Sequence, residues 1–349
     1  MIEKSLCEIS NPKQWKTIST DMLKDEGYPV YGANGIIGYY SEYNHEEKTL
    51  LITCRGATCG SLNICDPYSY VNGNAMALDN LIEEINIHYL YYYLLSRGLN
   101  DTITGTAQPQ IVRQSLQKVV IKYPELEVQH QIVNRLNQVA NLINKRKKQL
   151  KKLDELVKSR FIEMFGDPNS NEKGWTVSTL GEYMTLLTDF SANGSYELLD
   201  SNVVMYDEPN YAVMVRTTDL EAGNLTDGVK YIDQTAYELL SKSKLYGGEL
   251  IMNKIGSAGK IYIMPQIDKP ASLGRNAFMF RFDDRINMVY LYALLSSDYG
   301  TKEIQQYVRG AVTKTITKES TRSIRVIVPP IELQEQFAAF VEQVDKFKI

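Results

Sequence analysis

The sequence predicts an α+β fold of two tandem β-rich domains that are separated by long helices of the coiled-coil type, with a pseudo-two-fold internal repeat. The chain has 349 residues, of which 44% are hydrophobic and 23% charged, a composition typical of a globular protein with about two domains. Short segments recur in the same order at an offset of roughly 200 residues. Between the two copies lies a stretch without proline or glycine, from Val128 to Phe165.

The repeat is visible in three kinds of segment. ITCRGATCGS at 52–61 matches IMNKIGSAGK at 251–260, which makes Arg55 the counterpart of Lys254. Apolar residues follow the i, i+3, i+4, i+7 pattern of an amphipathic helix at 87–94 and again at 288–295. Each copy then has a short apolar strand, at 119–123 and 324–328, and a proline that is typical of a strand-to-helix junction.

A long helix follows each of these prolines. Apolar residues at alternating spacings of four and three predict a heptad seam on the first helix and its partner on the second. The predicted pairing residues are Ile132, Leu136, Val139, Ile143, Leu150, Leu153 and Val157 on the first helix and Phe337, Val341 and Val344 on the second. The second helix stops at Ile349, which aligns with Asn144. We therefore expect residues 145–165 to lack an intramolecular partner.

These patterns predict four segments. They are a first domain at 1–123, a spacer helix at 124–166, a second domain at 167–328 and the start of a second spacer helix at 329–349. The formal net charge is -4, which argues against general nucleic-acid binding by bulk charge. Residues 145–160 are locally basic, with eight basic and two acidic side chains. This run fits either a solvated helix face or a contact with a phosphate backbone.

Catalytic motifs are absent from the sequence. An adenine methyltransferase motif needs two prolines before an aromatic residue, and the nearest string is Asp66-Pro67-Tyr68. GSAGK at 256–260 lacks the glycine spacing of a phosphate-binding loop, so we expect a turn between two strands. The four cysteines lack zinc-module spacing and are interpreted as small buried residues. We expect no catalytic, cofactor-binding or metal-binding residue here, and a cytoplasmic protein without signal peptide or membrane span.

The residues that could contact DNA lie in both copies. Tyr31, Asn34, Gly35 and Tyr39 belong to a segment with Asn-Gly between two β-rich runs, a strong signal for a hairpin. Such a hairpin could present polar groups to base edges, or it could be a structural turn with tyrosines in the core. The remaining candidates are basic or polar residues near predicted strands, each of which could also be an ordinary surface residue: Arg55, Arg216, Thr217, Lys254, Arg275 and Arg322.

Taken together, these segments resemble the specificity subunit of type I restriction-modification enzymes. The resemblance rests on YPVYGANGIIGYY, LLITCRGATCGS, ELIMNKIGSAGK and the repeated P-x-x-E-x-Q-x-Q helix starts, and it covers essentially the whole chain. It implies that each domain reads one half of a split DNA target and that antiparallel helices fix the spacer between the halves. It also implies a subunit without activity of its own.

The resemblance further implies partners. Two modification subunits would carry S-adenosylmethionine and methylate adenine, and restriction subunits would use ATP and Mg²⁺. This sequence departs from the family where its second helix ends at Ile349. From that departure we expect weaker domain spacing, weaker binding of a modification subunit, or completion of the helix by a second chain.

Other functions stay open at this point. The chain could be a silent or regulatory variant with a shortened helix, a fragment of a fused restriction-methylation enzyme, or a coiled-coil interaction protein that does not read DNA. Two complete domains without a methyltransferase motif favour the DNA-reading subunit.

Overall fold

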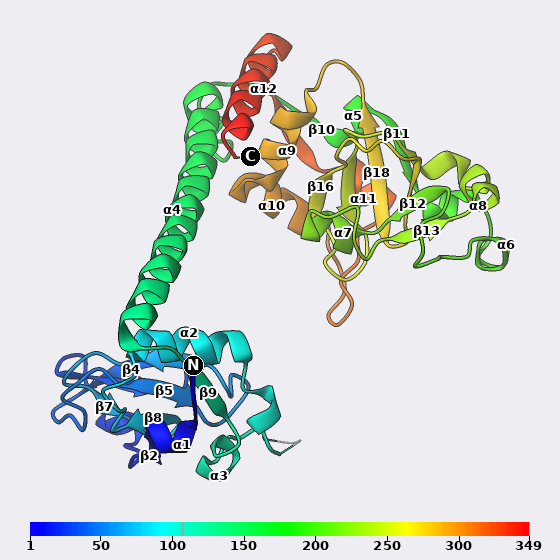
Figure 1. Ribbon diagram of the computed structural model, residues 1–349. Helices are drawn as coiled ribbons and strands as arrows, with labels where there is room; N and C mark the ends of the chain where they lie inside the picture. The colour runs from blue at the N-terminus through cyan, green and yellow to red at the C-terminus, as the bar shows by residue number, and fades with distance from the viewer. Residues whose placement is uncertain (106–107, 349) are drawn as a thin grey trace. The chain divides into compact units, whose positions relative to one another are not determined.

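The computed structural model describes residues 1–105 and 108–348 of the chain (Figure 1). It divides into two compact units, Met1–Arg146 and Lys147–Ile349. Helix α4 (Leu126–Phe165) begins in the first unit and ends in the second, so the division falls inside the helix. The predicted helix over 128–165 is confirmed, and so is the α+β class with two tandem domains.

The first unit is built on two main sheets. The antiparallel sheet has the order β2-β8-β5-β6, with β2 (Asn11–Gln14), β8 (Ala75–Asp79), β5 (Leu50–Thr53) and β6 (Leu62–Ile64). The second sheet has the order β4-β3-β7, with β4 (Gly35–Tyr40), β3 (Tyr28–Gly32) and β7 (Tyr70–Val71), and β3 runs parallel to β7. A separate pair joins β1 (Ile2–Ser5) to β9 (Val120–Tyr123).

Short helices connect and cover these strands. They are α1 (Leu6–Ile9), η1 (Thr20–Met22), α2 (Ile87–Arg97), η2 (Asn100–Thr102) and α3 (Arg113–Leu116). In α2 the periodic residues Leu90 and Leu94 are buried in the main core of the unit, which fulfils the amphipathic pattern at 87–94.

The second unit repeats this sheet plan. Its antiparallel sheet has the order β11-β18-β15-β16, with β11 (Met184–Asp189), β18 (Ala277–Phe282), β15 (Leu250–Asn253) and β16 (Ile261–Ile263). The other sheet has the order β13-β12-β17-β14, with β13 (Lys230–Ile232), β12 (Ala212–Val215), β17 (Ala271–Leu273) and β14 (Lys244–Leu245). Strands β12 and β17 are parallel, as β3 and β7 are. A final pair joins β10 (Thr176–Thr179) to β19 (Arg325–Val328).

The additional residues of the second copy form short helices around these sheets. The helical elements of the unit are α5 (Leu180–Tyr183), η3 (Phe190–Asn193), α6 (Tyr196–Asn202), α7 (Thr217–Ala222), α8 (Gln234–Leu239), η4 (Ser241–Ser243), α9 (Met288–Ser296), α10 (Asp298–Gln305), α11 (Lys318–Arg322) and α12 (Ile331–Lys346). Helix α9 buries Leu291 and Leu294 in the largest apolar core, as the pattern at 288–295 predicted. The turn expected at 256–260 lies between the antiparallel strands β15 and β16.

The predicted hairpin at 28–40 forms, with a different turn. Gly32 pairs with Gly35, so Ala33 and Asn34 form the turn in place of Asn34 and Gly35. Gly35 instead opens β4 with a φ of 100°. Few residues other than glycine adopt this conformation. Gly35 is therefore needed at the first residue after the turn, where it pairs with Gly32.

Helix α12 packs against the last turns of α4 inside the second unit. The ring of Phe337 lies 5.5 Å from that of Phe161 and 5.6 Å from that of Phe165. Near the other end of α12, Lys348 forms an ion pair with Asp154 at 2.9 Å. Since later residues of α12 meet earlier residues of α4, the two helices run antiparallel. The expectation that residues 145–165 lack an intramolecular partner is therefore wrong, because an antiparallel α12 packs on the C-terminal end of α4.

The seam on α4 differs from the predicted one at its C-terminal end. As predicted, Val157 and Val341 pack against the core and Val344 is buried. Beyond Val157, the heptad pattern predicted that positions 160 and 164 face the partner helix. The buried side chains are instead those of Phe161 and Phe165. A straight α-helix has 3.6 residues per turn, so a 3.5-residue pattern drifts by about one position over four heptads. Earlier in α4, Ile132 packs in the first unit and Leu150 and Leu153 are half-buried. Leu136, Val139 and Ile143 are exposed.

Candidate nucleic-acid interface

The ends of five strands meet at one edge of the second unit. Asn253 at the end of β15 pairs with Ala277 at the start of β18, and Asp189 at the end of β11 pairs with Phe278. The parallel strands β12 and β17 end together at Val215 and Leu273. We call the segments that follow these ends the loop edge: in this unit it comprises Asp189, Arg216–Thr217, Lys254, Arg275–Asn276 and residues 309–315.

Two lysines share one buried carboxylate at this edge. Lys254 Nζ lies 2.8 Å from Asp189 Oδ2, and Lys318 Nζ lies 2.9 Å from Asp189 Oδ1. Burial acts to raise the pKa of Asp189, but the hydrogen bonds and charges of the two lysines outweigh it and hold the pKa below its ordinary value. The carboxylate therefore stays ionised and fixes both ammonium groups.

Two arginines are held at the same edge. Arg275 stacks its guanidinium 4.9 Å from the ring of Phe190 and contacts Asp200. Arg216 places its guanidinium against Asp219, with Nη2 at 2.6 Å from Oδ1 and Nε at 3.0 Å from Oδ2. Thr217 begins α7 directly after Arg216. The structure thus brings together four predicted residues of the second copy, Arg216, Thr217, Lys254 and Arg275, and adds Lys318.

A hairpin at residues 309–315 completes this edge. Arg309 and Thr315 exchange backbone hydrogen bonds of 2.9 and 2.7 Å, and Val312 near the tip is 98% exposed. Sequence reasoning missed this hairpin. Its signal was available, because Thr104-Gly105 and Gln110-Ile111 match Arg309-Gly310 and Thr315-Ile316 at the same offset of 205 as the helix starts.

The first unit has an equivalent loop edge, which comprises Gln14, Ala33–Asn34, Arg55, Gly73–Asn74 and the described residues of 104–110. The hydroxyl of Thr53, at the end of β5, donates to the carbonyl of Ala33 at the hairpin turn. The Gln14 side chain donates to Gly73 O at 3.2 Å. Arg55 is exposed, and its backbone bridges to Gln110. Neutral amides dominate this edge, whereas cations dominate the equivalent edge of the second unit.

The structure corrects the pairing of Arg55 with Lys254. The N–H of Lys254 donates to Asn276 O and its carbonyl accepts from Ile316 N, and Cys54 makes the same two bonds with Asn74 and Ile111. Lys254 is therefore the counterpart of Cys54, and Arg55 is the counterpart of Ile255. The loop of the second unit is one residue shorter, so an ungapped comparison of the sequences shifts the register.

The other predicted residues lie at different places. Asn34 is at the loop edge, Gly35 follows it as the first residue of β4, and Tyr39 is exposed on β4 away from the turn. Tyr31 is buried, and its hydroxyl donates to Asp66 Oδ2 at 3.0 Å, so its ring is part of the core and is not presented to solvent. Arg322 is exposed on α11 beside Gly181, apart from the edge. Contact with DNA by the exposed residues stays a prediction.

The basic run on α4 is solvent-exposed over most of its length. Lys147, Lys148 and Lys152 are exposed, Lys151 pairs with Glu155 at 3.8 Å, and Arg160 pairs with Glu163 at 2.9 Å. A phosphate contact by this run stays a prediction.

The cysteines are free thiols. Cys54 and Cys65 are buried, and burial raises the pKa of both. His45 is buried with its ring nitrogens 2.7 Å from Asn44 Oδ1 and 2.9 Å from Asp79 Oδ1. Among the described residues, no cluster of three or more histidine, cysteine or carboxylate side chains could hold a metal ion. Within the same residues no helix is long and apolar enough to cross a membrane.

The fold and its two loop edges define a duplicated α+β module joined by a long helix. Comparison with known proteins agrees. The model of the type I restriction modification DNA specificity domain matches residues 3–152 and again 172–349, so the chain belongs to this family, that of type I specificity subunits.

Individual relatives of the chain are specificity subunits of type I restriction enzymes. The chain is 25% identical over 312 residues to the MjaVIII specificity subunit of Methanocaldococcus jannaschii, covering 86% of this chain and 72% of that protein. It is 31% identical over 146 residues to the EcoprrI specificity subunit of Escherichia coli, covering 40% of this chain and only 36% of that protein.

Solved structures share the fold. The S subunit of a type I system from M. genitalium aligns over 99% of this chain and 90% of that chain, with a TM-score of 0.62 and 16% identity. A chain from a study of complex assembly and conformational transition in the type I system aligns with a TM-score of 0.51 and 15% identity, over 99% of this chain and 90% of that one.

Proposed function

We propose that the chain reads a bipartite DNA target, one half with each loop edge, and has no catalytic activity of its own. The observation that carries this proposal is the duplication of the loop edge: in both units, the same strand ends and the same hairpin gather polar or basic side chains at one place. Side chains of this kind are the ones that contact base edges and phosphates.

Partner subunits would supply the chemistry. We infer that two modification subunits bring S-adenosylmethionine and methylate adenine, and that restriction subunits use ATP and Mg²⁺. A groove of about 940 Å³ between α4, α9, α10 and α12 supports docking of a partner. Its walls include Val157, Phe161, Ile162 and Val341, and this apolar lining suits the apolar face of a helix.

Methylation mapping tests the reading function. DNA from cells carrying this gene with its neighbouring modification gene is sequenced by a method that detects methyladenine, with a deletion strain as control. We expect a split methylated motif that disappears on deletion. Arg275→Gln should alter or relax only one half of the motif, and Arg55→Gln only the other. An unchanged methylation pattern in the deletion strain would contradict the proposal.

Co-purification tests the docking. Ile162→Asp places a charge in the groove, where Ile162 is 49% exposed, and should weaken assembly with the modification subunit. Val204→Asp is the control, because Val204 is 50% exposed outside the groove. Equal assembly of the two variants, measured by size-exclusion chromatography with light scattering, would place the partner elsewhere.

A further inference from the structure

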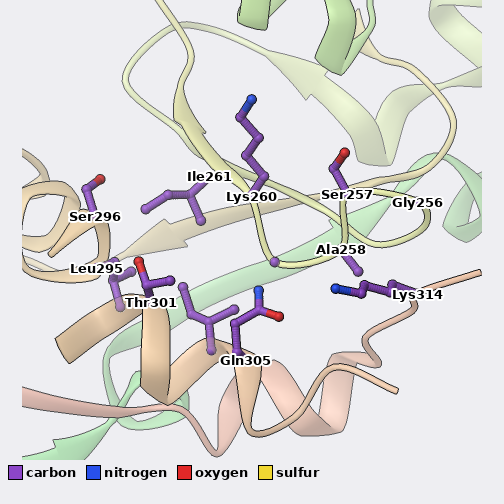
Figure 2. Close-up of a pocket in the computed structure, with 12 residues that line it drawn as sticks. Gly256, Ser257, Ala258, Lys260, Ile261, Leu295, Ser296, Thr301, Gln305 and Lys314 are labelled. Atoms are coloured by element: carbon purple, nitrogen blue, oxygen red, sulfur yellow. The ribbon is translucent and has the colours of Figure 1, made fainter. Parts of the chain in front are cut away.

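A pocket of about 560 Å³ lies beside the hairpin of residues 309–315 in the second unit. The loop at 256–261, the end of α9, helix α10 and Lys314 form its walls. Figure 2 shows Lys314 and Gln305 extending toward one another across the hollow, while Lys260 extends from the other side of its loop. None of the described residues that line the pocket is acidic.

Three polar groups of the pocket have no partner among the described residues. The ammonium of Lys314, the side-chain amide of Gln305 and the hydroxyl of Thr301 form no hydrogen bond or ion pair there. The neighbouring lysines, in contrast to Lys314, each have a carboxylate partner. Lys254 is bound to Asp189, and Lys260 is bound to Glu221 at 2.5 Å. Lys314 is thus a cation of the loop edge that is left available for an anion from outside.

The pocket has a rigid wall. Gly259, on the loop, has a φ of 87°, and a Cβ there would lie only 2.5 Å from Ile304 Cγ2 on α10. Loop and helix are therefore in close contact, which the glycine alone permits. The carbonyl of Lys314 also accepts a hydrogen bond of 2.9 Å from Gly256 N, so the hairpin is tied to the same loop.

The first unit lacks the cations of this hairpin. Gly56 N donates to Pro109 O at 3.2 Å, as Gly256 N donates to Lys314 O, so Pro109 occupies the place of Lys314. By the same bridges, Thr104 occupies the place of Arg309. The cationic group is a property of the second unit and not of the repeat.

We propose that this pocket binds one phosphate of the DNA backbone beside the half-target that the second unit reads, with Lys314, Gln305 and Thr301 as donors. The proposal rests on the function proposed above. A phosphate contact fixes the position of a protein on the duplex and carries no sequence information. The second unit thus supplies a salt-dependent anchor that the hairpin of the first unit does not.

The test compares Lys314→Gln with Lys269→Gln in the full chain assembled with its modification subunit. Lys269 precedes β17, at the opposite end of that strand from the loop edge, so the control has the same change in charge at a remote place. Binding to a labelled duplex with the mapped target and to a scrambled duplex is titrated against salt. Lys314→Gln should weaken both complexes by a similar factor and make the slope of log K against log salt shallower by about one.

Two control variants and the wild-type complex separate the possible outcomes. Lys269→Gln should bind like the wild type, and Lys314→Arg should keep the wild-type slope. Equal behaviour of Lys314→Gln and Lys269→Gln would overturn the proposal, and so would a loss confined to one base position of the target, which would indicate a base contact. A wild-type complex that does not distinguish target from scrambled DNA would instead refute the proposed function.

Discussion

The side-chain amide of Gln334 joins the start of α12 to the N-cap of α9 at Asn287. Its Oε1 accepts from Asn287 N at 2.9 Å, and its Nε2 donates to Pro329 O at 2.8 Å and to Arg285 O at 3.4 Å. In the first unit, Gln129 makes the same three hydrogen bonds with Asn86, Pro124 and Glu84, at 2.9, 2.9 and 2.8 Å. Both glutamines are fully buried. One buried amide thus fixes each long helix to its unit.

Gln334→Ala should lower the free energy of unfolding of the second unit by about 1–3 kcal/mol, because it leaves the half-buried Asn287 N–H and the buried Pro329 carbonyl without their side-chain partner. Gln336→Ala is the matched control, since Gln336 is exposed on the same helix. Urea unfolding followed by circular dichroism measures both. Equal midpoints for the two variants would show that the amide has no such role.

The sequence predicted this architecture because the repeat and the helical periods are local patterns. The recurring proline, glutamate and glutamine residues at 124–131 and 329–336 marked both helix starts. The role of Gln129 and Gln334 could not be predicted, because two of the three partners of each glutamine lie more than 40 residues away in the chain. The drift of the seam to Phe161 likewise depends on the real helical period.

The candidate interface was predictable only in part. Arg216, Lys254 and Arg275 were chosen as basic residues near strands, but only the pairing of β12 with β17 and of β15 with β18 brings them to one edge. Tyr31 was chosen as part of the predicted hairpin, but its ring is buried and its hydroxyl donates to Asp66. The hairpin at 309–315 could have been found from its match to 104–111 at an offset of 205. Lys318 could not, because it reaches the edge through its contact with Asp189, 129 residues away in the chain.

Asp189→Asn should destabilise the second unit at neutral pH by roughly 2 kcal/mol, because it removes the charge that Lys254 and Lys318 share. The folded pKa of Asp189 is lowered, so its stabilisation is fully present above the unfolded pKa of about 4 and is lost as the pH falls through the folded pKa. The difference in urea midpoint between wild type and variant should therefore shrink below about pH 4. Asp268→Asn, at an exposed turn, is the control, and a difference that grows on acidification would contradict this account.

Phe337→Ala should release α12 from α4. Phe337 is fully buried against Phe161 and Phe165, and loss of such a ring costs about 3–5 kcal/mol. Phe340→Ala, on the same helix but half-buried, should cost clearly less. Thermal unfolding ranks the two variants, and limited proteolysis near the C-terminus should cleave the Phe337 variant faster. The opposite ranking would mean that the aromatic cluster does not hold the helices together.

Gly310→Ala should disturb the hairpin of the loop edge more than the fold. Gly310 has a φ of 103°, and a Cβ there would lie 2.1 Å from the carbonyl oxygen of Thr313, so the turn must open or shift. Strain of this kind costs about 1–3 kcal/mol, and we expect roughly a tenfold loss of DNA affinity with a small change in melting temperature.

Gly223→Ala is the control, because that glycine also has a positive φ, 64°, but its Cβ would meet open space at the end of α7, outside the hairpin. It should lower stability slightly and leave DNA affinity unchanged. Fluorescence anisotropy with a labelled duplex measures the affinities, and wild-type binding by the Gly310 variant would remove the hairpin from the interface.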